Sequence, residues 1–484
     1  MHRNISEFDR VLRGGQVVTP DGVAEIDVGI ADGCIAALGR NLAAASQEID
    51  ANGLWVMPGG VDPHCHIEQM SGMGVMNADT FETATLSAAM GGTTSVISFA
   101  AQAKGQRLSD TLADYALRAQ RGARVDHAFH LSISDPEVDG FDHDLAALIA
   151  AGHRSIKVFT TYDIRLDDAQ ILSVMAAARL HGALVCVHAE NHGLIDWTRQ
   201  ALLRAGLTAP KYHAPSHPRM AEVEAVSRMI SFAEFMACPV MLFHISTAEG
   251  VDLIRAARAR GVPVWAETCP HYLFMTEDAL DQPGLEGAKW MCSPPQRSEA
   301  DQAALWEGMD HGAIDLVSSD HAPYRFDESG KLSAGPEADF SQIANGLPGL
   351  EPRLPLLFDA MMAQGRGGPE SFAALTASVP ARLYGLKSKG EIAIGKDADL
   401  TLWDPQASTV FGANDLHDNV GYNPWEGTSL RGAVHMVLMR GQVIVQDGAC
   451  LAQPGQGHWL RREQIGTVTQ ATPAPEVQLL EASE

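Results

Sequence analysis

Two histidines separated by a single residue end the apolar run "LWVMPGGVDPHCH", which covers residues 54–66. Alternate residues of a β-strand face the same side, so His64 and His66 can point together while Cys65 points away. Imidazole nitrogens are ligands that Zn²⁺ and its divalent neighbours accept. The pair alone has two interpretations, namely one half of a metal site or two polar residues that end a strand.

Residues of similar chemistry lie in or just after later apolar runs. Lys157 lies in "SIKVFTTY", with Tyr162 five residues further on, and His188 ends "LVCVH". His244 ends "PVMLFH", and Asp320 follows "IDLVSS". Metal-capable groups at five such ends favour a metal site. Lys157 is the exception, because a protonated ammonium repels a cation, and its spacing alone favours a buried structural lysine.

The runs that carry these residues alternate with helical patterns. Eight apolar runs of strand length lie between residues 54 and 321, separated by segments such as "DTFETATLSAAMGG" and "DAQILSVMAAARLHG". Val- and Ile-rich strands that alternate with helices indicate a parallel sheet buried on both faces. Eight units over roughly three hundred residues predict a TIM-like (β/α)₈ barrel, whose catalytic residues lie at the C-terminal ends of its strands.

The two ends of the chain show a different pattern. Short β segments with Gly-Gly and Asp-Gly turns fill residues 1–56 and return in residues 388–450. We therefore predict a small β-sandwich domain built from both termini, with the catalytic barrel at residues 57–387. Residues 451–484 are predicted to form a C-terminal tail, either a mobile end or an arm that lies on a neighbouring subunit.

Composition narrows the class of partner. The formal net charge of the 484 residues is -25, which argues against nucleic acid or an anionic membrane as the main partner. Apolar runs fall short of the roughly 20 residues of a membrane span, and the N-terminus lacks the apolar centre of a secretion signal. The seven cysteines include no CxxC pair, which favours free thiols in a cytoplasmic protein.

Taken together, the motifs resemble a known family. "PGGVDPHCH", "SIKVFTTY", "VHAEN", "LFHIS", "CSPPQR" and "SSDHAPY", in that order, are similar to the amidohydrolase superfamily, specifically its hydantoinase/dihydropyrimidinase branch. The resemblance covers nearly the whole chain apart from the final tail. It implies a homotetrameric hydrolase that opens a cyclic amide or imide ring, of dihydropyrimidine or hydantoin type, to an N-carbamoyl amino acid by means of a metal-bridging hydroxide.

The resemblance implies two divalent ions, usually zinc, and six ligands: His64, His66, Lys157, His188, His244 and Asp320. The two histidines of the first strand end and the aspartate of the eighth would hold the buried ion, and the other two histidines the more exposed one. The lysine would bridge both ions as an N6-carboxylated side chain, which accounts for the residue that spacing could not explain.

The resemblance also implies how the substrate is handled. Tyr162 would point its hydroxyl at the substrate carbonyl, and Ser293 and Asn345 would bind the cyclic amide through backbone contacts. Asp320 would take the proton of the hydroxide and return it to the leaving ring nitrogen.

Several alternatives stay open at this point. Allantoinase keeps much the same ligand set, whereas a mononuclear deaminase lacks the bridging lysine. A non-catalytic scaffold is disfavoured because every expected ligand is present. Glu68 stands where dihydroorotases typically carry an arginine for the substrate carboxylate, and we expect its charge to repel such a group. Loops 70–76 and 324–340 are expected to shape the pocket.

The remaining histidines are expected to have other roles. We expect structural or surface positions for a group in loops, at helix ends and at strand starts: His127, His130, His181, His213, His217 and His311. His271 and His321 lie near the predicted strand ends and are candidates for supporting the ligands.

Overall fold

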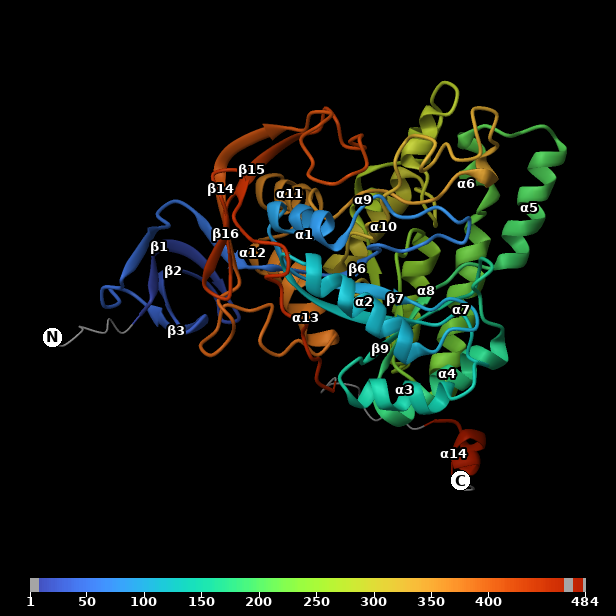
Figure 1. Ribbon diagram of the computed structural model, residues 1–484, viewed down its shortest axis with the longest axis horizontal. Helices are drawn as coiled ribbons and strands as arrows, with labels where there is room; N and C mark the ends of the chain where they lie inside the picture. The colour runs from blue at the N-terminus through green and yellow to red at the C-terminus, as the bar shows by residue number, and fades with distance from the viewer. Residues whose placement is uncertain (1–7, 465–472, 482–484) are drawn as a thin grey trace.

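A computed structural model describes residues 8–464 and 473–481 of the chain (Figure 1). Its centre is a sheet of eight strands, paired in parallel and in their order along the chain. The strands are β6 (Gly60–Cys65), β7 (Thr93–Ala101), β8 (Asp126–Ser132), β9 (Ser155–Phe159), β10 (Leu184–His188), β11 (Val240–Leu242), β12 (Val264–Thr268) and β13 (Leu316–Val317).

The first and last strands of this sheet meet and close it. Cys65 of β6 forms a parallel bridge with His321, which follows β13. The buried guanidinium of Arg353 donates to the carbonyl oxygens of Val61 and Val317, which holds the same two strands together from inside the fold. The predicted (β/α)₈ barrel is confirmed.

Helices cover the outside of the barrel (Figure 1). In chain order they are α1 (Phe81–Met90), α2 (Leu108–Gly122), α3 (Phe141–Ala150), α4 (Asp168–His181), α7 (Arg219–Met236), α8 (Ala248–Ala259) and α10 (Glu299–Asp310). The ends of these helices follow local chemistry. The Asp167 side chain accepts the Gln170 N–H at the start of α4, and Gly182 ends that helix with a left-handed φ of 74°.

Other helical segments lie in the connections and near the chain's end. The α-helices are α5 (His192–Arg204), α6 (His213–Ser216), α9 (Pro270–Phe274), α11 (Arg353–Phe358), α12 (Pro369–Ala373), α13 (Val379–Leu383) and α14 (Pro475–Glu481). The 3-10 turns are η1 (Pro210–Tyr212), η2 (Glu277–Leu280), η3 (Glu286–Trp290) and η4 (Phe340–Gln342), and the π-helical turns are η5 (Asp359–Ala363) and η6 (Ala374–Ser378).

A second sheet takes strands from both ends of the chain, which lie side by side in Figure 1. Its members are β1 (Arg10–Thr19), β2 (Gly22–Ala31), β3 (Cys34–Gly39), β4 (Gln47–Asp50), β5 (Trp55–Pro58), β14 (Leu400–Val410), β15 (Ser429–Met439), β16 (Gln442–Gln446) and β17 (Ala449–Cys450). Strand β5 pairs with both β1 and β14 and so joins the two ends. Apolar side chains from both ends, such as Val28 and Leu438, share one core. The small domain has the predicted origin, and its boundaries stay a prediction.

The chain's own C-terminal segment covers the N-terminal end of the barrel. Leu460 N donates to the carbonyl of His127, and His127 N donates to the carbonyl of His458. The guanidinium of Arg462, 3% exposed, donates to the Ser155 hydroxyl and the Phe129 carbonyl. Residues 451–464 of the predicted tail therefore lie against their own barrel. Residues 465–472 and 482–484 fall outside the described residues, and the arm role stays a prediction.

A buried ion cluster joins the barrel to the terminal sheet at this same end. Lys389 Nζ lies 2.6 Å from Asp126 Oδ2, at the start of β8, and 2.8 Å from Asp399 Oδ2. Arg440 also pairs with Asp126. Because each of these carboxylates has a cationic partner, burial of the charges is compensated.

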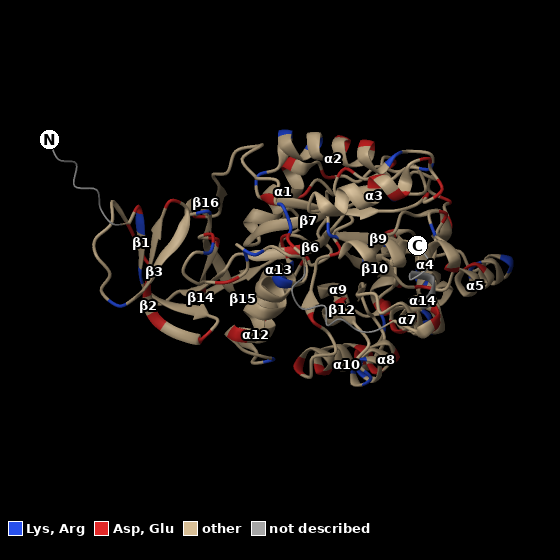
Figure 2. Cartoon of the chain, turned by 90° about the horizontal axis from the view of Figure 1, so that it is seen from below, with Lys and Arg blue, Asp and Glu red and all other residues tan. Residues whose placement is uncertain are grey.

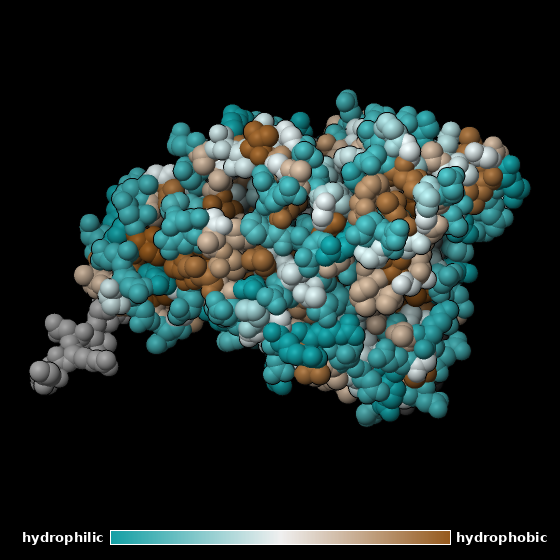
Figure 3. Space-filling view, turned by 45° about the horizontal axis from the view of Figure 1, so that its top comes forward, coloured by the Kyte–Doolittle hydropathy of each residue, from teal (hydrophilic) through white to brown (hydrophobic). Residues whose placement is uncertain are grey.

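The surface is polar and carries both signs of charge. Figure 2 shows acidic and basic residues interspersed along the outer helices, and Figure 3 shows a face on which hydrophilic residues predominate and apolar ones form small groups. Within residues 8–464 and 473–481, helices with the length and apolarity needed to cross a membrane are absent.

Candidate active site

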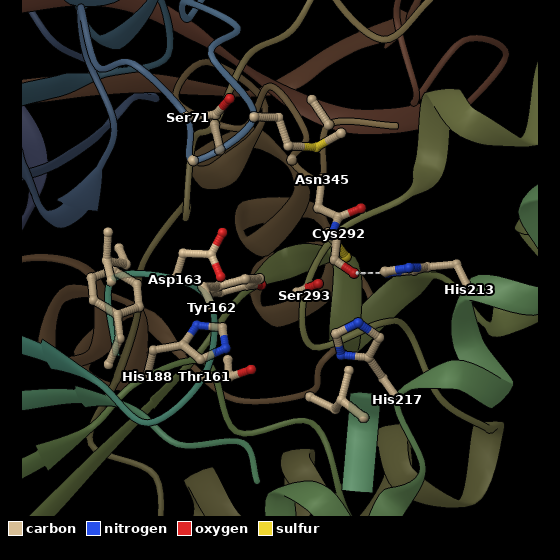
Figure 4. Close-up of a pocket in the computed structure, with 18 of the residues that line it drawn as sticks. Ser71, Thr161, Tyr162, Asp163, His188, His213, His217, Cys292, Ser293 and Asn345 are labelled. Atoms are coloured by element: carbon tan, nitrogen blue, oxygen red, sulfur yellow. Dashed lines mark hydrogen bonds between the residues drawn. The ribbon is translucent and has the colours of Figure 1, made fainter. Parts of the chain in front are cut away.

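The C-terminal ends of the barrel strands open into one cavity of about 510 Å³. Its walls include the nine residues that the sequence singled out: His64, His66, Lys157, Tyr162, His188, His244, Ser293, Asp320 and Asn345. They come from five strand ends and two loops, which the barrel brings together although the first and last lie 281 positions apart in the sequence. Figure 4 shows Tyr162, His188, Ser293 and Asn345 around this space.

The first and eighth strand ends meet at Asp320. Its Oδ1 lies 3.0 Å from His64 Nε2 and 3.3 Å from His66 Nε2. Ligand atoms of His64, His244 and Asp320 all lie within 4.8 Å of one another, which is the spacing a metal ion needs. On the other side, the rings of His188 and His244 have centroids 4.5 Å apart. The imidazole and carboxylate donors therefore fit divalent ions of the zinc class.

Three of the site residues have a left-handed backbone. The φ angles are 67° at Tyr162, 39° at His244 and 44° at Asp320. Such a conformation costs a non-glycine residue about 1–3 kcal/mol and is found most often where function requires a particular side-chain direction. Strands β11 and β13 end before His244 and Asp320, so these two side chains turn into the cavity from beyond the extended strands.

Charge at the first strand end is strongly coupled. Burial opposes the charged form of His64, but Asp320 and Glu267 outweigh it and raise its pKa to about 9. Burial likewise opposes the charged form of Asp320, yet His64 and the hydrogen bond from His66 hold the pKa of this carboxyl well below its usual range. Asp320 is thus an anion, as a metal ligand must be.

Lys157 is buried among aromatic rings. Its ammonium lies 4.0 Å from the ring centroid of Phe243 and 4.8 Å from that of Phe159. Burial lowers the pKa of Lys157 to about 8, although Asp320 and Glu267 oppose the shift. A lowered pKa increases the fraction of neutral amine, which is the form that reacts with CO₂ to give a carbamate.

Comparison with known proteins agrees with this geometry. The model of the amidohydrolase family matches residues 55–444. A D-hydantoinase of Rhizobium radiobacter is 38% identical over 94% of this chain and 99% of its own length. A D-phenylhydantoinase of Escherichia coli O7:K1 (strain IAI39 / ExPEC) is 39% identical over 94% and 98%. The crystal structure of dihydropyrimidinase from Brevibacillus agri NCHU1002 superimposes with a TM-score of 0.91 at 36% identity, over 94% of this chain and 99% of that one.

The chain belongs to the amidohydrolase family, in its hydantoinase branch.

This amidohydrolase contains two buried glutamates that sequence reasoning did not select. Glu267 of β12 accepts a hydrogen bond from His64 Nδ1. Glu190 accepts one from His188 Nε2, at 2.8 Å. Both carboxylates are fully buried. Each holds one nitrogen of a predicted metal ligand, as carboxylates behind metal-binding histidines commonly do. The spacing of two residues from His188 to Glu190 was an available signal for the second.

Two histidines for which we expected structural or surface positions also line the cavity. His213 and His217 are 2% and 5% exposed, and their ring centroids lie 4.7 Å apart. His213 Nε2 donates to the Cys292 carbonyl, the contact drawn in Figure 4, and His217 Nδ1 donates to Glu190. His217 has a structural contact, in line with the expectation, but its loop position could not indicate a partner 27 positions away.

Further expectations about histidines have structural outcomes. His130 is structural, since its ring bonds to the Ser155 hydroxyl and the Pro63 carbonyl. His321 lies next to Asp320 and bonds to Asp79, whereas His271 is buried with an Nε2 that has no described partner.

Glu68 does not face the substrate. Its carboxylate accepts the backbone N–H of Phe81 at the start of α1 and lies 4.0 Å from Arg118, and the residue does not line the cavity. The expectation that the charge of Glu68 repels a substrate carboxylate was therefore wrong, because the side chain does not line the cavity. The cavity wall at this corner is formed by the neighbouring Gln69 and by the loop through Met73.

Two polar atoms on the wall opposite the ligands have no partner. Ser293 Oγ and Asn345 Oδ1 are buried and form no hydrogen bond within the described residues. An unpaired buried polar atom costs about 1–3 kcal/mol, so such atoms are rare unless a ligand satisfies them. Both residues line the cavity, where a polar ligand would satisfy these atoms.

Proposed function

We propose that this amidohydrolase opens a hydantoin- or dihydropyrimidine-type ring and releases an N-carbamoyl amino acid. The observation that carries the proposal is the cavity itself, in which acid, imidazole and amine groups from five strand ends face two unpaired polar atoms. The similar proteins named D-hydantoinase and D-phenylhydantoinase support the same reaction class.

We propose that the predicted ligands hold two ions, most favourably Zn²⁺. His64, His66 and Asp320 would bind one, His188 and His244 the other, and Lys157 both, after its amine has become a carbamate. When bound, the ions would supply a water nucleophile that is active near neutral pH and positive charge beside the substrate carbonyl. The mutual spacing of the donors and the lowered pKa of Lys157 support this assignment.

Side chains of the cavity would transfer the proton, stabilise the developing charge and bind the substrate. The carboxylate of Asp320 would receive the proton of the attacking water and deliver it to the ring nitrogen that leaves. Burial raises the pKa of Tyr162 well above its usual value, so its hydroxyl stays protonated and can donate to the oxygen on which negative charge develops. Ser293 and Asn345 would bind the cyclic amide through backbone contacts, and their unpaired side-chain atoms line the same cavity.

Two properties are proposed without contacts in the structure, since the cysteine pattern favours the cytoplasm and the resemblance implies a homotetramer. The protein would be a cytoplasmic homotetramer. Light scattering of the purified protein measures its mass directly, and a monomer at working concentration would rule the tetramer out.

A substrate panel tests the reaction. It should contain dihydrouracil, 5-substituted hydantoins, allantoin, dihydroorotate and simple cyclic imides, with ring opening followed by loss of ultraviolet absorbance and by mass spectrometry. We expect turnover of hydantoins or dihydrouracil that disappears after chelation and returns with Zn²⁺. Turnover of allantoin or dihydroorotate alone would reject the proposed ring class, and no turnover of any member by metal-loaded protein would reject the function.

A further inference from the structure

Glu190 connects a metal-ligand histidine to a histidine in the substrate cavity. One carboxylate oxygen, Oε2, lies 2.8 Å from His188 Nε2, and the other, Oε1, lies 2.9 Å from His217 Nδ1. The carboxylate is fully buried, and its backbone N–H is held by the hydroxyl of Thr160. Both oxygens therefore have an imidazole partner.

This arrangement determines where the protons lie. A carboxylate oxygen accepts hydrogen bonds, so the nitrogen of each ring that faces Glu190 carries the proton. His188 is then protonated at Nε2, and its Nδ1 keeps a lone pair for an ion. The orientation of the His188 ring about its own side-chain bonds is fixed by the same contact.

The corresponding support behind the first strand end is simpler. Glu267 holds His64 through Oε1, but its Oε2 has no partner within the described residues. Glu190 differs because His217 occupies its second oxygen. His217 is itself fixed, since its carbonyl accepts from Arg297 Nη1 at 2.7 Å and Arg297 is 6% exposed.

Figure 4 places His217 among the residues that line the cavity, on the same side as His213 and Cys292. Its contact with Glu190 uses Nδ1, and the ring is part of the cavity wall. The residue therefore touches both the cavity and the carboxylate that orients a metal ligand.

We propose that His217 and Glu190 are positioning residues for His188, so that they strengthen the hold of the more exposed ion. This inference rests on the proposed two-ion function. Without His217, Glu190 Oε1 would face the cavity unpaired, and the carboxylate could rotate away from His188. Residues that support a metal ligand in this way typically change metal affinity by about 10- to 100-fold when they are replaced.

The test uses apoprotein of the full chain, prepared with a chelator, supplied with bicarbonate and titrated with Zn²⁺ against a competing metal dye. His217→Leu removes the donor to Glu190. His217→Asn keeps an N–H close to the position of Nδ1 and is the conservative variant. His213→Leu is the matched control, because this neighbouring cavity histidine bonds to the Cys292 carbonyl and not to Glu190. Thermal unfolding of each apoprotein shows whether the variant is folded.

We expect wild-type protein to bind two ions. His217→Leu should weaken the more weakly bound ion by about tenfold and leave the other unchanged. His217→Asn and His213→Leu should remain within about threefold of wild type. Unchanged affinity in folded His217→Leu, or an equal loss in His213→Leu, would overturn the inference. A folded wild type that binds a single ion would instead reject the two-ion function on which the inference rests.

If His217→Leu does not fold, the variant Glu190→Gln provides a second test. Glu190→Gln replaces an oxygen with an N–H that cannot accept from a histidine N–H, so it breaks one of the two contacts without changing side-chain volume. It should also lose affinity for the weaker ion by about tenfold, and wild-type affinity in this variant would equally overturn the inference.

Discussion

Buried carboxylates at the N-terminal end of the barrel pair with Lys389 and Arg440, whereas those at the C-terminal end pair with histidines and lie beside cavity atoms that have no partner. At the N-terminal end, burial opposes the charged form of Asp126, but Lys389 and Arg440 outweigh it and lower the pKa of this carboxyl. At the C-terminal end, burial raises the pKa of Glu267, and Ser293 and Asn345 have free polar atoms. One end is therefore arranged for stability, and the other keeps unsatisfied groups for metal and substrate.

The difference indicates which residues can be exchanged without loss of function. At the N-terminal end, Lys389 pairs with Asp126 and Asp399, and Arg462 donates to the Ser155 hydroxyl and the Phe129 carbonyl. At the C-terminal end, three residues have a left-handed backbone and some buried polar atoms are unpaired, and both features lower stability. Substitutions at the two ends should therefore separate activity from stability.

The largest effect is expected from Lys157→Ala. Loss of the amine removes the group that would bridge both ions, so metal binding and ring opening should both disappear. Metal content by mass spectrometry and turnover of a hydantoin measure the two. Lys157→Met, which fills more of the same space, should lose activity equally while unfolding at a temperature close to that of the apo wild type. Full activity in either variant would remove Lys157 from the site.

Asp320→Asn should reduce kcat by about 10²–10⁴-fold, which is the usual contribution of a positioned acid or base. The amide can still contact His64 and His66 but cannot carry the proton to the leaving nitrogen. Steady-state kinetics on metal-loaded protein measure the loss, with metal content determined on the same sample. Near-normal turnover would show that another group moves the proton.

Arg462→Met, at the N-terminal end of the barrel, should lower stability and leave activity unchanged. Its loss leaves the Phe129 carbonyl and the Ser155 hydroxyl without their charged donor, which should lower the free energy of unfolding by about 2–3 kcal/mol. The kcat of the folded enzyme should stay within about twofold of wild type, because the cavity is at the other end. Chemical denaturation and kinetics give both values, and a loss of activity at unchanged stability would contradict the division between the ends.

The smallest effect is expected at Asp418. Burial, helped by Asp79, raises its pKa from 3.8 to about 7. An acid with a raised pKa binds its proton more tightly in the folded state, so the free energy of unfolding falls as pH rises from about 4 to about 7. Asp418→Asn removes this loss.

The variant should be more stable than wild type by about 2 kcal/mol at pH 8 and nearly equal to it at pH 4. Thermal unfolding of both proteins across this range tests the sign. A gain that is the same at both pH values would show that charge at Asp418 is not the cause.

The sequence predicted the barrel and the ligand set because both follow from a repeating pattern. In a parallel barrel all strands end at one face, so polar residues after successive apolar runs must meet there. His64, His188 and Asp320 were found by this rule alone, and they line one cavity. Their roles as ligands stay predictions that the substitutions above test.

One apolar run of the sequence contains two strands of different sheets. Residues 54–66 read as a single barrel strand, but the structure divides them into β5, in the terminal sheet, and β6, in the barrel. The division occurs at Gly59, where a Cβ would lie 2.4 Å from Thr94 Oγ1. Apolar patterning is the same on both sides of this point, because each strand is buried in its own sheet.

Contacts between distant loops were also beyond local patterns. His217 has no periodic neighbour that predicts its partner, and its bond to Glu190 exists only once the strand end after β10 and the loop before α7 lie together. Glu68 is the reverse case, because its sequence position suggests the cavity while its backbone φ of 48° directs it toward α1.

Strand β5 pairs with β14 and so connects β1 to β4 to the C-terminal strands, and residues 457–463 cover the base of the barrel. During synthesis the first of these segments leaves the ribosome long before the last has been translated. The terminal sheet and the contacts of residues 457–463 with the base of the barrel can therefore form only after nearly the whole chain has been synthesised. A premature stop a few tens of residues from the end would remove residues 457–463 and yield a chain that carries every predicted ligand, yet has an uncovered barrel base.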